Sequence, residues 1–124
     1  MKKIIIIGLG NMGLAHLTAF TKKGGNKKRL FLVEKNKERR KRICKSLKEK
    51  KIDYEILKNV PKNKIFDFGV VASKSIERIN ICKKLIKNNK IKFLFLEKFL
   101  FNSLREYNIF KSLQSKFGIK TYVN

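Results

Sequence analysis

Residues 2–13 read KKIIIIGLGNMG, and their order predicts the first units of the fold. The four consecutive isoleucines, Ile4–Ile7, form an apolar run that is typical of a strand buried on both faces. A glycine pattern follows directly, at Gly8, Gly10 and Gly13. The first glycine permits a tight turn, the second lets another group approach the backbone, and the third lets a helix pack closely on the strand. The stretch therefore predicts a strand, a tight turn and a helix in immediate succession.

The start of this helix is a candidate binding site for phosphate. The helix is expected to begin near Asn11, where its free N–H groups and the positive end of its dipole would face the turn. A strand, a G-x-G-x-x-G turn and a helix in this order indicate a dinucleotide-binding unit. The candidate contacts to the pyrophosphate are the residues of the turn: Gly8, Leu9, Gly10, Asn11, Met12 and Gly13. The alternative is a purely structural glycine turn in another kind of α/β domain.

An acidic residue stands downstream at the distance that a dinucleotide site requires. Glu34 ends the next apolar run, 21 residues after Gly13. A carboxylate there accepts hydrogen bonds from the adenosine ribose hydroxyls and repels a 2′-phosphate, which favours NAD over NADP. The basic residues Lys35, Lys37 and Arg39 follow closely and leave NADP open as a second cofactor. An ordinary surface glutamate is the alternative.

Strand and helix patterns alternate along the whole chain. The predicted strands are Lys3–Ile7, Leu30–Val33, Tyr54–Leu57, Phe66–Ala72, Phe93–Leu96 and Lys120–Val123. The predicted helices are Asn11–Lys23, Lys37–Lys51, Ser75–Asn88 and the segment from Ser103 to Phe117. Apolar strands joined through helices are typical of a parallel sheet covered on both faces. We therefore predict an α/β fold, a three-layer, doubly wound Rossmann domain over residues 1–124, with six parallel strands in the order 3-2-1-4-5-6.

Capping residues predict the ends of these helices. Gly24-Gly25 is typical of the end of the first helix, and Gly118 of the end of the last. Asn36 and Ser75 are candidate N-caps. Ser103 and Glu106 have the spacing of a capping box. Leu14, Leu17 and Thr18 are expected on one face of the first helix, and Ile43, Cys44 and Leu47 form a thin apolar stripe on the second. Ile79, Cys82 and Ile86 are expected to point inward from the third.

The formal net charge of +23 calls for an interpretation of its own. Such an excess can mark a protein that binds nucleic acid or an anionic surface. Here the basic residues are spread over both halves of the chain, and lysine far outnumbers arginine, which is the better base reader. We interpret most of them as solvated outer faces of helices and expect no specific nucleic-acid partner, only weak polyanion binding at low salt.

The remaining composition excludes several classes of protein. No apolar run approaches the ~20 residues of a membrane span, and the N-terminus has no signal-peptide pattern, so we expect a cytoplasmic protein without a membrane partner. Cys44, Cys82 and the single histidine, His16, have no metal-ligand spacing, and no metal site is predicted. The cysteines are expected to be buried thiols. His16 is expected to pack or to hydrogen bond where the first helix meets the sheet.

Two further polar segments end strands of the predicted sheet. Ala72 and Ser73 end the fourth strand beside the topological switch point, so Ser73 is expected to face the nicotinamide half of the cofactor. The alternative is that Ser73 only begins the next helix. Glu97 and Lys98 end the fifth strand at the same edge. A lysine there can orient a substrate hydroxyl or act as an acid or base, although most lysines of this chain are expected to be solvated.

Taken together, these motifs resemble the glucose-fructose oxidoreductase, inositol dehydrogenase and MocA family. The resemblance lies in the pattern from Gly8 through Gly13 to His16, the acidic end of the second strand, the VVAS that ends the fourth, and the pair Glu97-Lys98. It covers essentially all 124 residues. The sequence departs from the family pattern at Phe99 and Lys74, where family members usually carry proline.

The resemblance implies an NAD(P)-dependent oxidoreductase acting on a sugar, cyclitol or sugar-nucleotide hydroxyl. By this resemblance the three glycines would hold the pyrophosphate and Glu34 the adenosine ribose. Ala72 and Ser73 would lie near the nicotinamide ribose. Glu97 and Lys98 would border the nicotinamide and a small sugar-like substrate, with Lys98 as the candidate catalytic residue that assists proton transfer.

Family members also carry a second α/β domain that supplies most substrate contacts, and these 124 residues contain none of it. The resemblance therefore implies a cofactor domain that is catalytically incomplete alone. Its bare apolar surface could pair copies of the chain into a homo-oligomer. A non-catalytic NAD-binding or sensor module, completed by a partner chain, is the alternative function. A basic nucleic-acid binder is a third.

Overall fold

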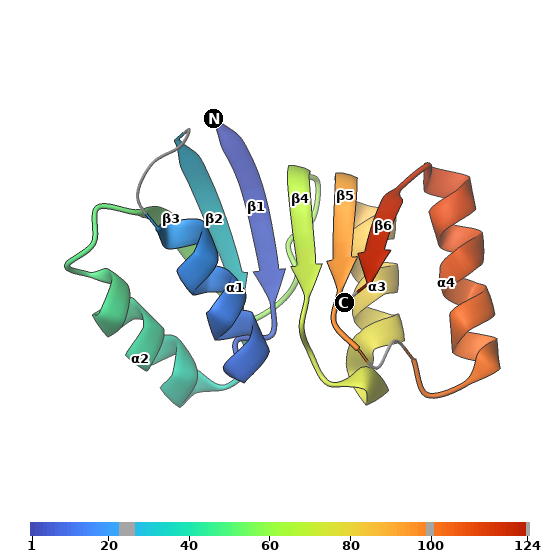
Figure 1. Cartoon of the computed structure of the whole chain (residues 1–124), viewed down its shortest axis with the longest axis horizontal. Helices are drawn as coiled ribbons and strands as arrows, with labels where there is room; N and C mark the ends of the chain where they lie inside the picture. The colour runs from blue at the N-terminus through green and yellow to red at the C-terminus, as the bar shows by residue number, and fades with distance from the viewer. Residues whose placement is uncertain (23–26, 99–100, 124) are drawn as a thin grey trace.

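The fold was analysed in a computed structural model that describes residues 1–22, 27–98 and 101–123. One parallel sheet holds six strands in the order β3-β2-β1-β4-β5-β6 (Figure 1). The strands are β1 (Lys2–Ile7), β2 (Lys28–Val33), β3 (Asp53–Leu57), β4 (Ile65–Val71), β5 (Lys90–Leu96) and β6 (Lys120–Val123). The helices are α1 (Asn11–Thr21), α2 (Lys37–Leu47), α3 (Ser75–Asn88) and α4 (Leu104–Phe117). The predicted Rossmann fold and strand order are confirmed.

The central strand explains why one apolar run organises the domain. β1 pairs with β2 on one side and with β4 on the other, so that Ile4 lies beside both Leu30 and Phe68. Successive side chains of a strand point to opposite faces. Ile4 and Ile6 therefore enter the core beneath α1 and α2, whereas Ile5 and Ile7 enter the core beneath α3 and α4. All four are at most 4% exposed, and burial of each contributes about 1.5–3 kcal/mol.

The two faces of the sheet are covered differently. On the α3 and α4 side, the predicted inward residues Ile79, Cys82 and Ile86 are all buried, as predicted. On the other side Leu17 is buried, whereas Leu14 and Thr18 of the same helix are exposed. All three residues line the same groove between α1 and α2, which agrees with the prediction that they share one face of the helix.

Several predicted boundaries shift by a few residues. α2 ends at Leu47, four residues before the predicted Lys51. Leu47 is the last apolar residue of the predicted helix, and the charged segment 48–51 after it is exposed, so a further turn would gain no burial. β5 begins at Lys90, three residues before the predicted start, because its register with β4 extends that far. α1 ends at Thr21, with Lys22 as its C-cap, two residues before the predicted Lys23; Lys23 itself and Gly24-Gly25 lie outside the described residues.

The predicted caps are found in part. The Asn36 side chain accepts a hydrogen bond from the Arg39 N–H, and Ser103 accepts one from the Glu106 N–H, at 2.9 and 3.2 Å. The reciprocal hydrogen bond of the capping box is displaced by one residue, because the Glu106 carboxylate accepts it from the backbone N–H of Asn102. Ser75 is not the cap of α3 but its first helical residue.

Both cysteines belong to the packing, to different degrees. Cys82 is fully buried in α3, and this burial raises the pKa of its thiol to about 12. Cys44 in α2 is only half-buried, so the expectation of a buried thiol is wrong for it. Its thiol lies beside Tyr54 of β3. The pKa of the Tyr54 hydroxyl is raised, mainly by desolvation and to a lesser degree by a hydrogen bond with Cys44.

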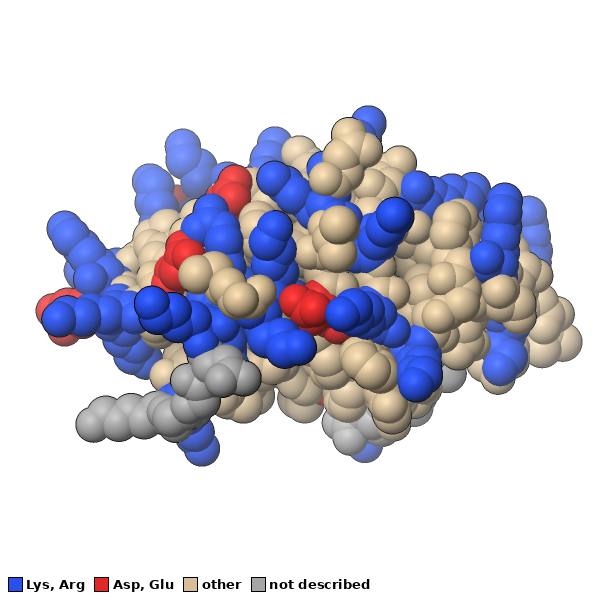
Figure 2. Space-filling model, turned by 90° about the horizontal axis from the view of Figure 1, so that it is seen from above, with Lys and Arg blue, Asp and Glu red and all other residues tan. Residues whose placement is uncertain are grey.

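The basic residues cover the surface broadly. Figure 2 shows the face at which the strands begin, with Lys and Arg side chains over its whole width and acidic side chains among them. Lys92 and Asp67 form one such ion pair on adjacent strands, and Arg29 pairs with Asp53 on another two. This face lies opposite the edge at which the strands end. Among the described residues, no helix is long and apolar enough to cross a membrane.

Candidate functional site

The carboxyl ends of the strands bring the predicted site segments together at one edge of the sheet. All arrows in Figure 1 point toward this edge. Backbone hydrogen bonds continue the ladder past the strand ends, from Gly8 N–H to the Val33 carbonyl at 2.9 Å and from Ala72 N–H to the Ile7 carbonyl at 2.8 Å. A third joins Glu97 N–H to the Val71 carbonyl at 3.2 Å. The turn after β1 therefore lies between the segments that follow β2 and β4.

The three glycines of the turn have different surroundings. Gly8 has a φ of +88°, and a Cβ there would lie 2.7 Å from the backbone nitrogen of Ser73. A Cβ on Gly13 would lie 1.8 Å from the carbonyl oxygen of Gly8. A Cβ on Gly10 would meet only the guanidinium tip of Arg39, at 3.9 Å. Gly8 and Gly13 are therefore required by the protein's own packing, whereas the space at Gly10 is open to a ligand.

The start of α1 is suited to an anion. Gly10 stands at the N-cap position, no side chain there forms a capping hydrogen bond, and the first turn holds no acidic residue. The N-termini of α2 and α4, by contrast, are capped by Asn36 and Ser103. Uncapped N–H groups and the helix dipole favour a phosphate at this position. The open space at Gly10 and the uncapped helix start therefore fit the pyrophosphate of a dinucleotide.

Glu34 follows β2, and its carboxylate is already engaged by the backbone. One oxygen accepts a hydrogen bond from Leu9 N–H and the other from Asn36 N–H, each at 2.9 Å. The residue is 7% exposed. Its carboxylate therefore fixes the glycine turn against the start of α2. The remaining lone pairs of the Glu34 carboxylate are free to accept hydrogen bonds from ribose hydroxyls.

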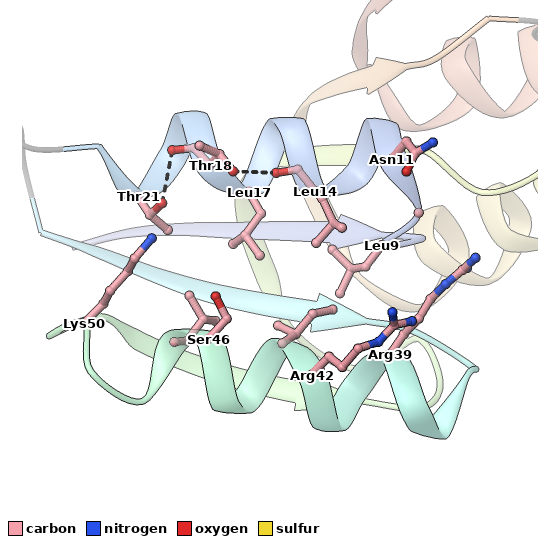
Figure 3. A pocket seen from close by; sticks show the side chains of 13 residues that line it. Leu9, Asn11, Leu14, Leu17, Thr18, Thr21, Arg39, Arg42, Ser46 and Lys50 are labelled. Atoms are coloured by element: carbon pink, nitrogen blue, oxygen red, sulfur yellow. Dashed lines mark hydrogen bonds between the residues drawn. The ribbon is translucent and has the colours of Figure 1, made fainter.

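Arg39 is the cation nearest to this carboxylate on the ligand side. Its guanidinium nitrogen lies 3.7 Å from the Glu34 oxygen and borders the open face of Gly10. Arg39 also stands at one end of the groove between α1 and α2, a cavity of about 420 Å³ (Figure 3). Leu9 and Asn11 line the same end (Figure 3), and Gly10 lies beside Arg39. A cation so placed reduces the repulsion that Glu34 alone would exert on a 2′-phosphate.

A second cleft, of about 490 Å³, gathers most of the other predicted site residues. It is lined by Met12, Ala72, Ser73, Lys74, Ser75, Ile76, Arg78, Glu97 and Lys98. The Ser73 hydroxyl oxygen is buried and has no hydrogen-bond partner among the described residues. The Lys98 side chain is exposed at the rim. Glu34 lines neither cavity, but its bond to Leu9 connects it to the turn between them.

Glu97 lines this cleft, but its side chain is almost completely buried. Its carboxylate is 4% exposed and lies 2.6 Å from Nε2 of His16 in α1. The His16 ring also packs edge-on against Phe95, with ring centroids 5.0 Å apart. The predicted hydrogen bond of His16 at the boundary of helix and sheet is confirmed. Glu97 thereby ties α1 to the end of β5.

The sequence interpretation missed Arg78, which is 2% exposed in α3. Its guanidinium donates to the backbone carbonyls of Ser73 and Glu97. Burial lowers the pKa of Arg78 from its usual value, and the charge of the Glu97 carboxylate opposes that effect. One signal was available: Arg78 stands one helical turn before the buried Cys82, on the inward face, in a chain whose cations are mostly lysine.

The structure shows no candidate metal site among the residues that it describes. No three His, Cys, Asp or Glu residues lie together there in a way that could hold a metal ion.

Comparison with solved structures shows the same fold in several dehydrogenases. Apo scyllo-inositol dehydrogenase from Lactobacillus casei matches with a TM-score of 0.79 and 16% identity, over 100% of this chain and 36% of that one. The same enzyme with bound NAD(H) and scyllo-inositol matches with a TM-score of 0.75 and 16% identity, over the same shares. A probable dehydrogenase from Thermotoga maritima matches with a TM-score of 0.76 and 19% identity, over 98% and 35%. The chain thus spans about a third of the length of these proteins.

A search among curated proteins finds no match. The family model for the oxidoreductase family with an NAD-binding Rossmann fold, Gfo/Idh/MocA, matches residues 2–124, which is nearly the whole chain. The strand order of the sheet agrees with that description. The chain therefore belongs to the Gfo/Idh/MocA oxidoreductase family and has its NAD-binding Rossmann fold.

Proposed function

We propose that this chain binds a nicotinamide dinucleotide along the carboxyl edge of its sheet. In this proposal it is the cofactor domain of a dehydrogenase that acts on a sugar, cyclitol or sugar-nucleotide hydroxyl. The contrast among the glycines carries the proposal. Gly8 and Gly13 are required by backbone contacts, whereas Gly10 is open where a pyrophosphate would lie.

Each part of the edge has a role in this proposal. The N–H groups at the start of α1 would hold the pyrophosphate, beside Gly10. Glu34 and Arg39 would border the adenosine ribose on the β2 side. Ser73 would lie against the nicotinamide half, where its buried hydroxyl gains a partner. When bound, the cofactor supplies hydride exchange between its nicotinamide and a carbinol carbon of the substrate.

Lys98 is the proposed proton-transfer group. Its side chain is exposed at the rim of the cleft that Ser73 also lines, so it can reach a substrate hydroxyl. An ammonium group there would donate a hydrogen bond to that oxygen and orient the carbinol carbon. The substrate class is supported by the similar structure that contains NAD(H) and scyllo-inositol.

We further propose that residues 1–124 act as the cofactor domain and that turnover needs protein outside them. The matching dehydrogenases are about three times as long as this chain, and Lys98, which lines the second cleft, is exposed. The isolated chain is expected to bind NADH and to reduce NAD poorly or not at all with cyclitols. Robust dehydrogenase activity of the chain alone would contradict this part of the proposal.

The binding proposal is tested by calorimetric titration with NADH and NADPH at about 150 mM salt, where surface lysines are screened. Gly10→Val fills the open space and should abolish NADH binding while the chain stays folded. Ala19→Val, on the exposed side of α1, adds similar bulk away from the site and should leave binding unchanged. Absence of binding to the wild-type chain would overturn the proposal, as would full binding by Gly10→Val.

A further inference from the structure

Arg78 is the most deeply buried charged side chain that the structure describes, at 2% exposed. It lies in the first turns of α3, among apolar neighbours along the helix such as Ile79 and Leu85. A buried cation costs free energy unless hydrogen bonds satisfy it. The hydrogen-bond partners of Arg78 therefore indicate the structural role of the buried guanidinium.

Two of those partners are backbone carbonyls that follow different strands. Nη2 donates to the Ser73 carbonyl at 2.6 Å, and Nη1 donates to the Glu97 carbonyl. Ser73 comes after β4 and Glu97 after β5, so a single planar group bridges the two segments. Because the donors of a guanidinium have a fixed fork geometry, this bridge sets the spacing between the two carbonyls.

The two bridged segments carry the polar groups of the second cleft. The buried Ser73 hydroxyl belongs to one segment, and Lys98 directly follows the carbonyl that Arg78 holds on the other. Arg78 itself lines the cleft, and Glu97 is held from its other side by His16 at 2.6 Å. The end of β5 is thus fixed between α1 and α3.

We propose that Arg78 is a positioning residue for the nicotinamide half of the cofactor site. By holding the Ser73 and Glu97 carbonyls, it keeps the Ser73 hydroxyl and the Lys98 side chain on the same cleft. This inference rests on the proposed function, since it assigns a role within that dinucleotide site. Arg78 has no role in this proposal at the adenosine half of the site, which lies at Glu34 and Arg39.

The test uses two ligands that share the adenosine and the pyrophosphate. NADH carries the nicotinamide ring, and ADP-ribose lacks it. The wild-type chain is expected to bind NADH more tightly. In Arg78→Met the dissociation constant for NADH should rise about tenfold, equivalent to about 1.4 kcal/mol, while that for ADP-ribose changes less than about twofold. Lys84→Met, on the exposed side of α3, removes a cation without touching the cleft and should change neither constant.

A conservative variant keeps the test valid if Arg78→Met does not fold. Arg78→Lys retains the charge but offers a single point donor, so it should hold one carbonyl rather than both and give an intermediate loss of NADH affinity. Circular dichroism and thermal unfolding would show that each titrated variant is folded.

Several outcomes would overturn the positioning role. One is a proportional loss of affinity for both ligands, which is what general destabilisation of the site would produce. Others are unchanged NADH affinity in both Arg78 variants, or a wild-type chain that binds the two ligands equally. If the wild-type chain binds neither ligand, the proposed function itself fails and this inference with it.

Discussion

Nε2 of His16 lies 2.6 Å from a carboxylate oxygen of Glu97, although 81 positions separate the two residues in the chain. His16 stands one turn into the helix that follows the glycine turn, and Glu97 ends β5. The contact therefore joins the helix after the glycine turn to the end of β5, across the edge at which the strands end. Both side chains are largely buried, at 22% and 4% exposed, so the interaction is shielded from solvent.

Replacing His16 should reveal the strength of this contact. His16→Ala leaves the buried Glu97 carboxylate with one partner fewer, which should lower the free energy of unfolding by about 1–3 kcal/mol. Urea unfolding of the variant and the wild type at neutral pH measures this difference in the free energy of unfolding. If the two groups interact directly, the double variant with Glu97→Gln should lose clearly less stability than the two single variants summed. Losses that add to within about 0.5 kcal/mol would contradict the interaction.

The glycines should separate stability from binding. In Gly13→Ala the new Cβ would lie 1.8 Å from the Gly8 carbonyl oxygen, so the backbone must move, at a cost of about 3 kcal/mol. In Gly10→Ala the Cβ enters open space, and the cost at an N-cap position should stay below about 1 kcal/mol. Chemical unfolding of the two variants tests the difference. Equal losses at both positions would show that Gly10 too is required by the fold.

Much of the fold was predictable because its signals are local. A continuous apolar run such as Ile4–Ile7 indicates a strand buried on both faces, and alternation with helices indicates a parallel sheet. The end of α2 was missed because nothing local stops a helix in a run of lysines. The helix ends at Leu47, its last apolar residue, because the charged residues 48–51 that follow are exposed and would gain no burial by continuing it.

The candidate site was predictable where its residues end strands, since the carboxyl ends of parallel strands meet at one edge. The contacts within it were not. Arg78 is buried because α3 presents that side to Ser73 and Glu97, an orientation that depends on how the helix crosses the sheet. The engagement of Glu34 by Leu9 N–H likewise follows from the path of the glycine turn in space.

Arg39 should weaken the discrimination against NADPH that Glu34 alone would impose. Its guanidinium lies 3.7 Å from the Glu34 carboxylate and beside Gly10, where a 2′-phosphate on the adenosine ribose would find a positive charge. Arg39→Gln removes that charge and should shift the ratio of NADPH to NADH affinity about tenfold toward NADH, equivalent to about 1.4 kcal/mol. Calorimetric titration with both nucleotides measures the ratio.

Arg42→Gln is the matched control for Arg39→Gln. Arg42 lines the same groove, on the next turn of α2, and its loss changes the net charge by the same amount (Figure 3). Arg42→Gln should lower the affinity for NADH and NADPH equally and leave the ratio of the two affinities unchanged. An unchanged ratio in Arg39→Gln, or an equal shift in both variants, would show that Arg39 contributes only a general field.

Asp67 in β4 should make stability depend on pH. Its carboxylate accepts a hydrogen bond from Lys3 N–H at 2.9 Å. This bond is the main cause that holds the pKa of Asp67 below its ordinary value of 3.8, against an opposing effect of desolvation and with help from Lys2 and Lys92. Because the pKa is lower in the folded chain than in the unfolded one, the charged form stabilises the fold. That contribution is complete above the unfolded pKa and is lost as the pH falls through the folded one.

Asp67→Asn should therefore lower the free energy of unfolding at pH 7, by up to about 1 kcal/mol because the group is partly exposed. The difference from the wild type should persist down to about pH 5 and shrink toward zero as the pH falls below 3.8. Glu38→Gln removes one negative charge from a side chain that is 77% exposed, and it corrects for the change in net charge. Urea unfolding at pH 7, 5, 3 and 2 measures both variants. A loss in Asp67→Asn that is the same at every pH, after this correction, would mean that the carboxylate contributes through packing rather than through its charge.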